Sequence, residues 1–319
     1  MKKKSSKILL IVACSLIGLF LVADLLVSNY MVKYALQPSS AVGNKDLSGE
    51  IKWMKEYYHT WDWFEDLRER GLMKDTTILD YRGEAKIHGY FCPAETESKR
   101  TAVIMHGYTS SPLSMTHIAR MFRDSLGFNV VLPGQYAHRL SEGDAIQMGW
   151  FDRFNLEKWS AMAHDLFADT LQVYHGISMG GATVMMASGD DLPEYVRGII
   201  EDCGYTTVWD QFTLSIKQMH LPMIVLWTAD KITRLRYGWG YKEASSLRQL
   251  EKSTLPMLFI HGDSDDFVPT EMVYRNYEAK KQGYKEIWLG ANSAHGESYM
   301  NNSAAYTQKV REFLTEHVY

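Results

Sequence analysis

The residues best suited to chemistry lie in Val173–Gly181, where Gly176, Ser178 and Gly180 form a Gly-x-Ser-x-Gly pattern. An apolar run precedes the serine and a helix-forming run, 182–187, follows it, which predicts a sharp strand-to-helix turn. Such a turn projects the hydroxyl, and the flanking glycines let neighbouring backbone pass without a Cβ clash. The start of the helix also directs free N–H groups at developing negative charge. We therefore expect Ser178 to be a nucleophile.

A serine hydroxyl is a weak nucleophile, so it needs a base, and the base needs an acid that orients it. Asp265 lies in a Gly-x-x-Asp-x-x-Val-Pro stretch and His295 in a short Ala-His-Gly loop. Each follows a predicted strand, and the chain order Ser, Asp, His is the one that accompanies this kind of serine turn. We expect His295 to be the general base and Asp265 its partner, with Asp263 and Asp266 as alternative acids.

Attack by such a serine creates an oxyanion, which requires two hydrogen-bond donors. The N–H of Met179, directly after the nucleophile, is the first candidate. The second is the N–H of Tyr108, in the loop that follows the predicted strand ending at His106-Gly107. We expect His106 and His175, which precede the two functional turns, to hydrogen-bond loop backbone.

The composition gives no indication of a metal or an organic cofactor. The three aspartates at 263–266 lack the further spaced oxygen ligands and distal glutamate of a calcium loop. Cys14, Cys92 and Cys203 show neither metal-ligand spacing nor a disulfide framework. A net charge of −4 argues against a nucleic-acid partner. We expect no cofactor and no metal.

These residues must be positioned by a sheet, and the apolar periodicity predicts one. Strands are expected at 76–81, 84–91, 101–106, 128–132, 173–177, 196–201, 256–260 and 286–289, and helices at 115–125, 156–171 and 304–314. Buried strands that alternate with helices predict an α/β fold with a mostly parallel sheet covered on both faces. Each candidate site residue then lies at a strand end, where such sheets carry their sites.

The N-terminus predicts a membrane segment. Lysines at 2, 3, 4 and 7 precede Ile8–Ser28, which contains one charge, Asp24, and is long enough to span a bilayer. We expect an uncleaved signal-anchor at 1–28 with the remainder outside the cytoplasm. A lipoprotein-like box ending at Cys14 is the alternative. A linker is expected at 29–50, including a polar tether at 39–49, and the main domain at 51–319.

Two segments of the main domain are rich in aromatic side chains. Residues 51–72 show helical spacing of apolar residues, which predicts an amphipathic helix packed on the domain, with contact to lipid headgroups as the alternative. Residues 206–253 are long, aromatic and Met-containing. We expect this insertion to form a lid over the strand ends, and packing on the sheet edge is the alternative.

Taken together, the motifs at 106–109, 176–181, 262–269 and His295 resemble those of the α/β-hydrolase superfamily. They are most similar to membrane-anchored bacterial members related to prolyl-oligopeptidase-type peptidases and esterases. The resemblance covers the chain from about Asp75 onward and implies an α/β-hydrolase fold. One loop departs from it: relatives usually read Pro-Asp-x-Arg-x-His-Gly, whereas this chain has Gly134, Tyr136 and Arg139 at the Asp, Arg and Gly positions. We expect the bracing of the oxyanion side to be altered there.

The residues and the resemblance together imply a serine hydrolase that cleaves carboxylic esters through an acyl-enzyme. A serine peptidase with the same triad is the first alternative, and a non-catalytic binding protein on the same fold is the second. The expected partners are a small-molecule ester or peptide substrate, and a membrane bound through the N-terminal helix.

Overall fold

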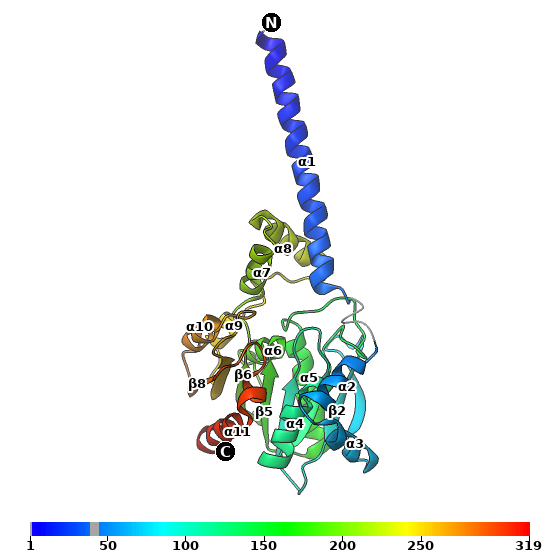
Figure 1. Cartoon of the computed structure of the whole chain (residues 1–319), viewed down its shortest axis with the longest axis vertical. Helices are drawn as coiled ribbons and strands as arrows, with labels where there is room; N and C mark the ends of the chain where they lie inside the picture. The colour runs from blue at the N-terminus through cyan, green and yellow to red at the C-terminus, as the bar shows by residue number, and fades with distance from the viewer. Residues whose placement is uncertain (1, 39–44) are drawn as a thin grey trace.

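The computed structural model describes residues 2–38 and 45–319, with side chains from residue 7 onward. A long helix, α1 (Lys2–Leu36), projects from a body built around a central sheet (Figure 1). Within Lys7–Leu36, an 18-residue window has a mean hydropathy of 2.7 and none of it is buried, so α1 is long and apolar enough to cross a membrane. Most of the predicted tether, 39–44, lies outside the described residues.

Eight strands form one sheet in the order β1-β2-β4-β3-β5-β6-β7-β8. The first two join through a hairpin, β2 pairs with β4 antiparallel, and all later neighbours are parallel. The mostly parallel sheet predicted from the sequence is confirmed. Its strands are β1 (Lys74–Leu79), β2 (Lys86–Cys92), β3 (Arg100–Met105), β4 (Asn129–Pro133), β5 (Leu171–Ile177), β6 (Val196–Asp202), β7 (Met257–Gly262) and β8 (Lys285–Gly290).

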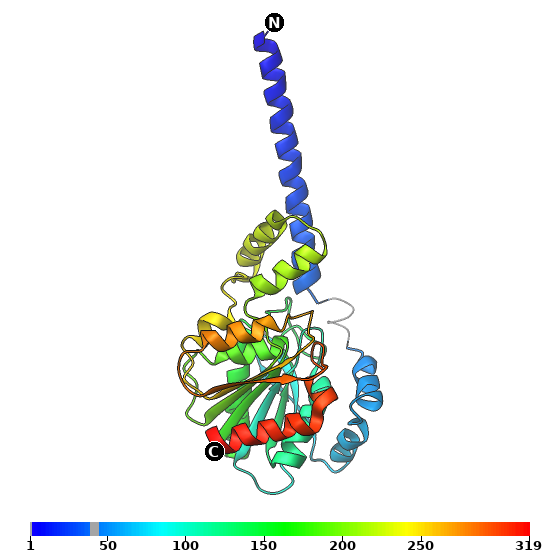
Figure 2. The same ribbon diagram turned by 60° about the vertical axis from the view of Figure 1, so that its left-hand side comes forward.

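Helices cover both faces of this sheet (Figure 2). One apolar layer joins the sheet to α2 (Ser48–Glu56), α3 (Trp61–Glu69), the short segments η1 (Pro112–Met115), α4 (Thr116–Arg120) and η2 (Met121–Ser125), and α11 (Ser298–His317). The opposite layer joins it to α5 (Asp152–Phe167), α6 (Met179–Ala187), α9 (Ser246–Leu250) and α10 (Glu271–Ala279). Strand β5, which leads to Ser178, is buried along its whole length because both layers cover it.

Several predicted boundaries differ from the structure. The amphipathic segment 51–72 is two helices, α2 and α3, because the backbone turns at His59, whose φ is +51°. Helix α5 ends at Phe167 rather than 171, since Leu171 begins β5. The predicted helix 115–125 is divided into a 3₁₀ turn, a short α-helix and a π turn.

The predicted lid contains α7 (Val208–Gln218) and α8 (Met223–Tyr237), which lie beside the last turns of α1, above the sheet (Figures 1 and 2). A third apolar cluster fills this neck and includes Val32 and Leu36 of α1. The sequence predicted a linker from residue 29, and this boundary was wrong: α1 continues to Leu36. It does so because its last turns pack against the body instead of leading away from it.

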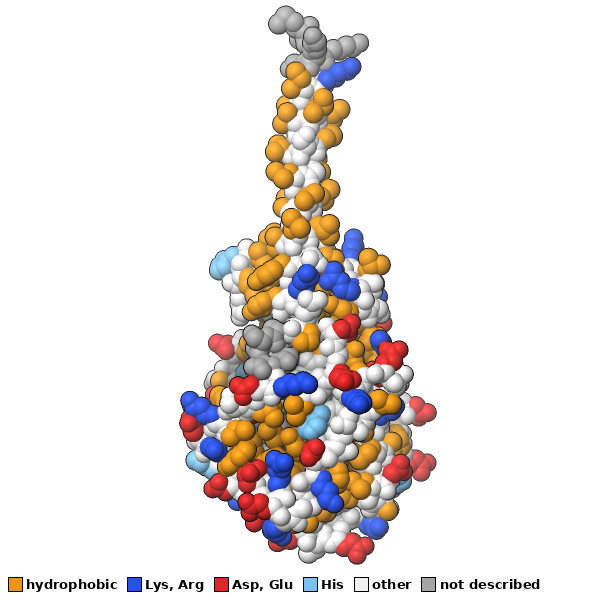
Figure 3. Space-filling view, turned by 90° about the vertical axis from the view of Figure 1, so that its right-hand side faces the viewer, with side chains coloured by type: hydrophobic (Ala, Val, Ile, Leu, Met, Phe, Trp, Pro, Cys, Tyr) orange, Lys and Arg blue, Asp and Glu red, His pale blue; other side chains and the backbone are white. Residues whose placement is uncertain are grey.

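Helix α1 contacts the body through one stripe. Asp24, Ser28, Val32 and Leu36 are buried, whereas the other described side chains of α1 are exposed or partly exposed. A spacing of four residues places these side chains on one face of a helix. The stripe therefore docks the end of α1, and the apolar residues before it project free of the body (Figure 3).

Candidate active site

Ser178 occupies a strained turn between β5 and α6. Its φ is +59° and its ψ is −118°, a conformation that L residues rarely adopt. The two flanking glycines are required by close backbone contacts. A Cβ on Gly176 would lie 2.1 Å from the Gly180 carbonyl oxygen, and one on Gly180 would lie 2.2 Å from that of Met105. The turn thus holds the hydroxyl at the carboxyl end of the sheet.

His295 lies between Ser178 and Asp265. Its Nε2 is 2.8 Å from the Ser178 Oγ, and its Nδ1 is 2.7 Å from the Asp265 Oδ2. The three residues come from the ends of β5, β7 and β8, separated in sequence by 87 and 30 residues but adjacent at one edge of the sheet. With Nδ1 donating to the carboxylate, Nε2 is free to accept the serine proton.

Asp265 is the aspartate that meets His295. Its Oδ1 accepts hydrogen bonds from the N–H groups of Phe267 and Val268, each at 3.0 Å. Burial alone would raise the pKa of this carboxyl, but hydrogen bonds from His261 and His295 outweigh burial and lower it to about 2. The carboxylate is therefore ionised at neutral pH.

The two alternative acids lie elsewhere. Asp266 is exposed. Asp263 is also exposed, and its carboxylate accepts from the N–H of Ser293 at 3.2 Å and from the hydroxyl of Ser264. Asp263 thus supports the loop that carries His295, and it does not contact the imidazole.

The backbone around the two predicted oxyanion donors is close to Ser178. Met179 is the first residue of α6, so its N–H has no acceptor within the helix. Gly107 packs against the serine: a Cβ there would lie 3.3 Å from the Ser178 Cβ. The Tyr108 N–H follows directly, and the Tyr108 hydroxyl donates to the Ala35 carbonyl oxygen of α1 at 2.9 Å.

The loop that departs from the related sequences braces this backbone with other residues. The Gln135 N–H donates to the His106 Nε2 at 3.1 Å, and its side-chain amide donates to the His106 carbonyl oxygen. Arg139 donates to the Thr109 carbonyl oxygen at 3.2 Å and forms an ion pair with Glu50 at 2.7 Å. Sequence reasoning missed Gln135, and no local pattern marks it.

The two buried histidines have different partners. His106 contacts loop backbone as predicted, because its Nδ1 lies 2.8 Å from the Gly107 carbonyl oxygen. For His175 the prediction was wrong: its Nε2 lies 2.7 Å from the Tyr306 hydroxyl of α11. That side chain points into the layer between the sheet and α11, where burial lowers its pKa to about 3.

One group of residues has the spacing of a metal site. Ligand atoms of Cys203, Asp265 and His295 all lie within 4.8 Å of one another. Metals bind the thiolate form of cysteine, however, and burial raises the pKa of Cys203 well above its usual range. Asp265 and His295 are also hydrogen-bonded to each other. The arrangement therefore fits a serine, imidazole and carboxylate chain better than a metal centre.

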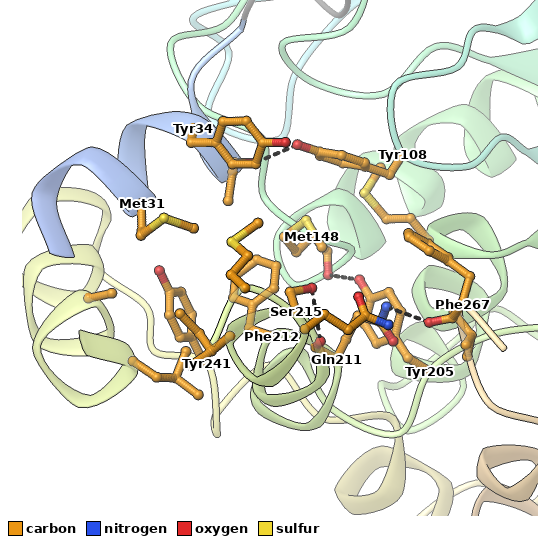
Figure 4. A pocket seen from close by; sticks show the side chains of 18 of the residues that line it. Met31, Tyr34, Tyr108, Met148, Tyr205, Gln211, Phe212, Ser215, Tyr241 and Phe267 are labelled. Atoms are coloured by element: carbon orange, nitrogen blue, oxygen red, sulfur yellow. Dashed lines mark hydrogen bonds between the residues drawn. The ribbon is translucent and has the colours of Figure 1, made fainter. Parts of the chain in front are cut away.

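Two cavities meet at Ser178. The first, of about 270 Å³, is lined by α1, the lid and the body, with aromatic and methionine side chains facing inward (Figure 4). The second, of about 240 Å³, lies on the His295 side, and several of its lining residues are polar, among them Ser110, Ser114 and Glu297. The Ser178 hydroxyl therefore lies between an apolar cavity and a second cavity that has more polar groups in its walls.

Comparison with known proteins identifies a family and two related proteins of similar sequence. Residues 155–319 match the prolyl oligopeptidase family. The chain is 31% identical over 231 residues to the uncharacterized protein YqkD of Bacillus subtilis. The aligned region covers 72% of this chain and 75% of YqkD. It is 24% identical over 221 residues to the protein bem46 of Schizosaccharomyces pombe, with 69% of each chain covered.

Solved structures show the same fold. The esterase Pf2001 of Pyrococcus furiosus superposes with a TM-score of 0.65 at 20% identity, covering 79% of this chain and 94% of the esterase. The acylaminoacyl peptidase of Pyrococcus horikoshii superposes with a TM-score of 0.55 at 17% identity, covering 80% of this chain and 43% of the peptidase. The fold is that of the α/β-hydrolases.

Proposed function

Since this chain belongs to the prolyl oligopeptidase family, we propose that it is a serine hydrolase that cleaves carboxylic esters with Ser178, His295 and Asp265. The observation that carries the proposal is the position of the His295 ring, within hydrogen-bond distance of both the Ser178 hydroxyl and the Asp265 carboxylate.

In the proposed reaction, the His295 Nε2 takes the Ser178 proton while Oγ attacks the ester carbonyl carbon. The N–H groups of Met179 and Tyr108 hold the resulting oxyanion. As the intermediate collapses, the alcohol leaves with the proton from His295. Water then attacks the acyl-enzyme with His295 again as base. The carboxylic acid is released, and Ser178 is regenerated when His295 returns the proton to its Oγ.

The apolar cavity favours an ester with a substantial hydrocarbon part. Its walls include Phe212, Tyr241, Met148 and Met219, and such side chains gain free energy by covering hydrocarbon rather than charged or polar chain. A peptidase with the same triad is the second candidate, and the family description and the similarity to an acylaminoacyl peptidase favour it.

Labelling and a substrate panel test this function. We expect a fluorophosphonate probe to label the full-length protein and the Ser178→Ala variant to lose all labelling. The panel compares short p-nitrophenyl esters with aminoacyl and prolyl anilides. Turnover of esters alone supports the esterase, turnover of anilides supports the peptidase, and a folded wild type that neither labels nor turns over any substrate supports a non-catalytic binding protein.

We also propose that α1 stays attached as a membrane anchor, with the hydrolase domain outside the cytoplasm. The lysines before the span support this orientation. The buried stripe of α1 supports retention, because cleavage after a signal sequence would remove side chains that fill the neck. Residues 206–253 would then form a lid next to the bilayer.

A further inference from the structure

We propose that the apolar cavity beside Ser178 receives the acyl chain of a membrane lipid ester, and that the last turns of α1 form one wall of this substrate site. The proposal rests on the ester hydrolase function above and specifies its substrate. Met31, Tyr34 and Ala35 of α1 line the cavity together with residues of the lid and the body. Figure 4 shows Met31 and Tyr34 on one side and Phe212 and Tyr241 close to them.

Specific polar contacts hold this wall in place. The Thr228 hydroxyl of α8 donates to the Asp24 carboxylate at 2.6 Å, and the Ser28 hydroxyl donates to the Val225 carbonyl oxygen at 3.1 Å. A carboxylate and a hydroxyl within an otherwise apolar helix are costly unless they find partners. Both find them on the lid, so α1 and α8 form one docked unit.

The end of α1 is also tied to the backbone around the nucleophile. The Ile146 N–H donates to the Leu36 carbonyl oxygen at 2.7 Å, and the Leu36 side chain is fully buried. The Tyr108 hydroxyl donates to the Ala35 carbonyl oxygen, and Tyr108 is the residue whose N–H is proposed to hold the oxyanion. The same helix that projects from the body thus reaches the oxyanion side of Ser178.

The length of α1 places the lid at the bilayer surface. Residues 8–28 rise about 30 Å, which is the thickness of a bilayer core. The docked stripe begins at Asp24, so the lid meets the last turn of the span. There, Leu235 is 91% exposed and Trp227 is 47% exposed. Exposed leucine and tryptophan beside basic side chains are typical of a surface at the membrane interface. Figure 3 shows Lys and Arg side chains at this neck.

The cavity extends from Ser178 toward α1. Next to the serine its walls are buried side chains such as Met179, Tyr205 and Val268, whereas Tyr34 and Met219 are exposed lining residues on α1 and at the end of α7. The exposed pair Tyr34 and Met219 marks an opening toward α1, in addition to one beside Phe267, which is exposed next to His295. The opening toward α1 lies beside the helix that would enter the bilayer, so a hydrocarbon chain can pass from the bilayer to the serine along an apolar path.

The second cavity completes the fit to an amphiphile. It shares Ser178 and Tyr108 with the first cavity, and Ser110, Ser114 and Glu297 add polar atoms to walls that are otherwise largely apolar. A lipid ester has a hydrocarbon chain on one side of its carbonyl and a polar alcohol on the other. In the proposed complex the hydrocarbon chain lies in the first cavity and the alcohol in the second, with the scissile bond at Ser178.

Chain-length selectivity of the full-length protein in phosphatidylcholine vesicles tests the wall. We expect wild-type kcat/KM to be higher for p-nitrophenyl dodecanoate than for the butanoate, because each covered methylene contributes about fourfold. Ala35→Trp should lower the dodecanoate-to-butanoate ratio by about tenfold or more, because the indole fills the cavity. Lys33→Trp, on the exposed side of α1, is the matched control and should leave the ratio unchanged. Met219→Trp narrows the opening from the lid side and should lower the ratio in the same direction. It serves as the test variant if Ala35→Trp fails to fold.

The lipid itself is tested by adding monooleoylglycerol to the same vesicles and measuring released oleate, which we expect from wild type and not from Ser178→Ala. The proposal that α1 forms a wall of the acyl site would be refuted by a wild type that turns over butanoate without preferring dodecanoate. An unchanged ratio in both Ala35→Trp and Met219→Trp would refute it as well. Dodecanoate turnover without oleate release would refute the proposal that the substrate is a lipid ester taken from the membrane. Absence of both probe labelling and butanoate turnover would instead refute the proposed hydrolase function.

Discussion

The two sides of Ser178 are built on different principles. On one side, His295 and Asp265 come from strand ends of a rigid sheet, and both imidazole nitrogens and both carboxylate oxygens have hydrogen-bond partners. On the other side, the neck brings together α1, α7 and α8, which meet mainly through apolar contacts. The first side provides directional chemistry, and the second provides an enclosed volume.

This difference shows that a segment recognised only as an anchor can belong to the site. Had the predicted linker begun at residue 29, the wall formed by Met31, Tyr34 and Ala35 would be absent. The apolar cavity would then open to water beside Tyr108 and Ser178. The helix that is long and apolar enough to cross a membrane therefore also lines the pocket.

The largest expected effect concerns the directional side. Asp265→Asn removes the charge that orients the His295 ring, so kcat should fall by about 10³- to 10⁴-fold, equivalent to about 4–5.5 kcal/mol in the barrier. Asp266→Asn is the control, because it makes the same change one residue away at an exposed position. Steady-state kinetics on a short ester measure both. Equal rates for the two variants would remove Asp265 from the mechanism.

A smaller effect is expected in the neck. Leu36 is fully buried, whereas Leu26 on the same helix is 65% exposed. Leu36→Ala leaves a cavity and should lower the free energy of unfolding by about 2–5 kcal/mol, and Leu26→Ala should change it little. Thermal unfolding in detergent micelles, with limited proteolysis of the lid, measures the difference. Identical stability of the two variants would mean that α1 does not dock in solution.

The smallest expected effect is a difference in how the free energy of unfolding depends on pH, between a histidine of the body and one of the lid. Burial lowers the pKa of His117, which lines the second cavity, to about 3, whereas His220 lies exposed in the lid. Below about pH 6.5 the unfolded chain protonates residue 117 and the folded chain does not, so this histidine destabilises the fold as pH falls. At pH 5.5, replacement by asparagine should remove a penalty of about 1.4 kcal/mol.

This comparison uses the pH slope of stability, because loss of the stacking between His117 and Tyr58 shifts the whole curve without changing its slope. His220→Asn is the matched control and should keep the wild-type slope. Denaturant titrations at pH 7.5, 6.5 and 5.5 give the slopes. A wild-type slope in His117→Asn would show that the ring is protonated in the folded protein.

The sequence by itself determined the sheet and the candidate nucleophile, base and acid. Gly176, Ser178 and Gly180 are adjacent in the chain, and the turn that they form depends on local backbone sterics, so a short motif records it. Apolar strands that alternate with helices likewise specify a covered parallel sheet. For these features the physical cause lies within a few residues, and it can be read without coordinates.

Only the tertiary structure decided which groups surround that site. The sequence favoured Asp265 but left Asp263 and Asp266 as alternatives, and the contact with His295 separates the three. The replacement brace through Gln135 depends on a loop meeting His106 across 29 residues. The docking of α1 on the lid joins Asp24 to Thr228, 204 residues away. Such contacts leave no periodic or local pattern, because their free energy depends on surfaces that exist only after the chain has folded.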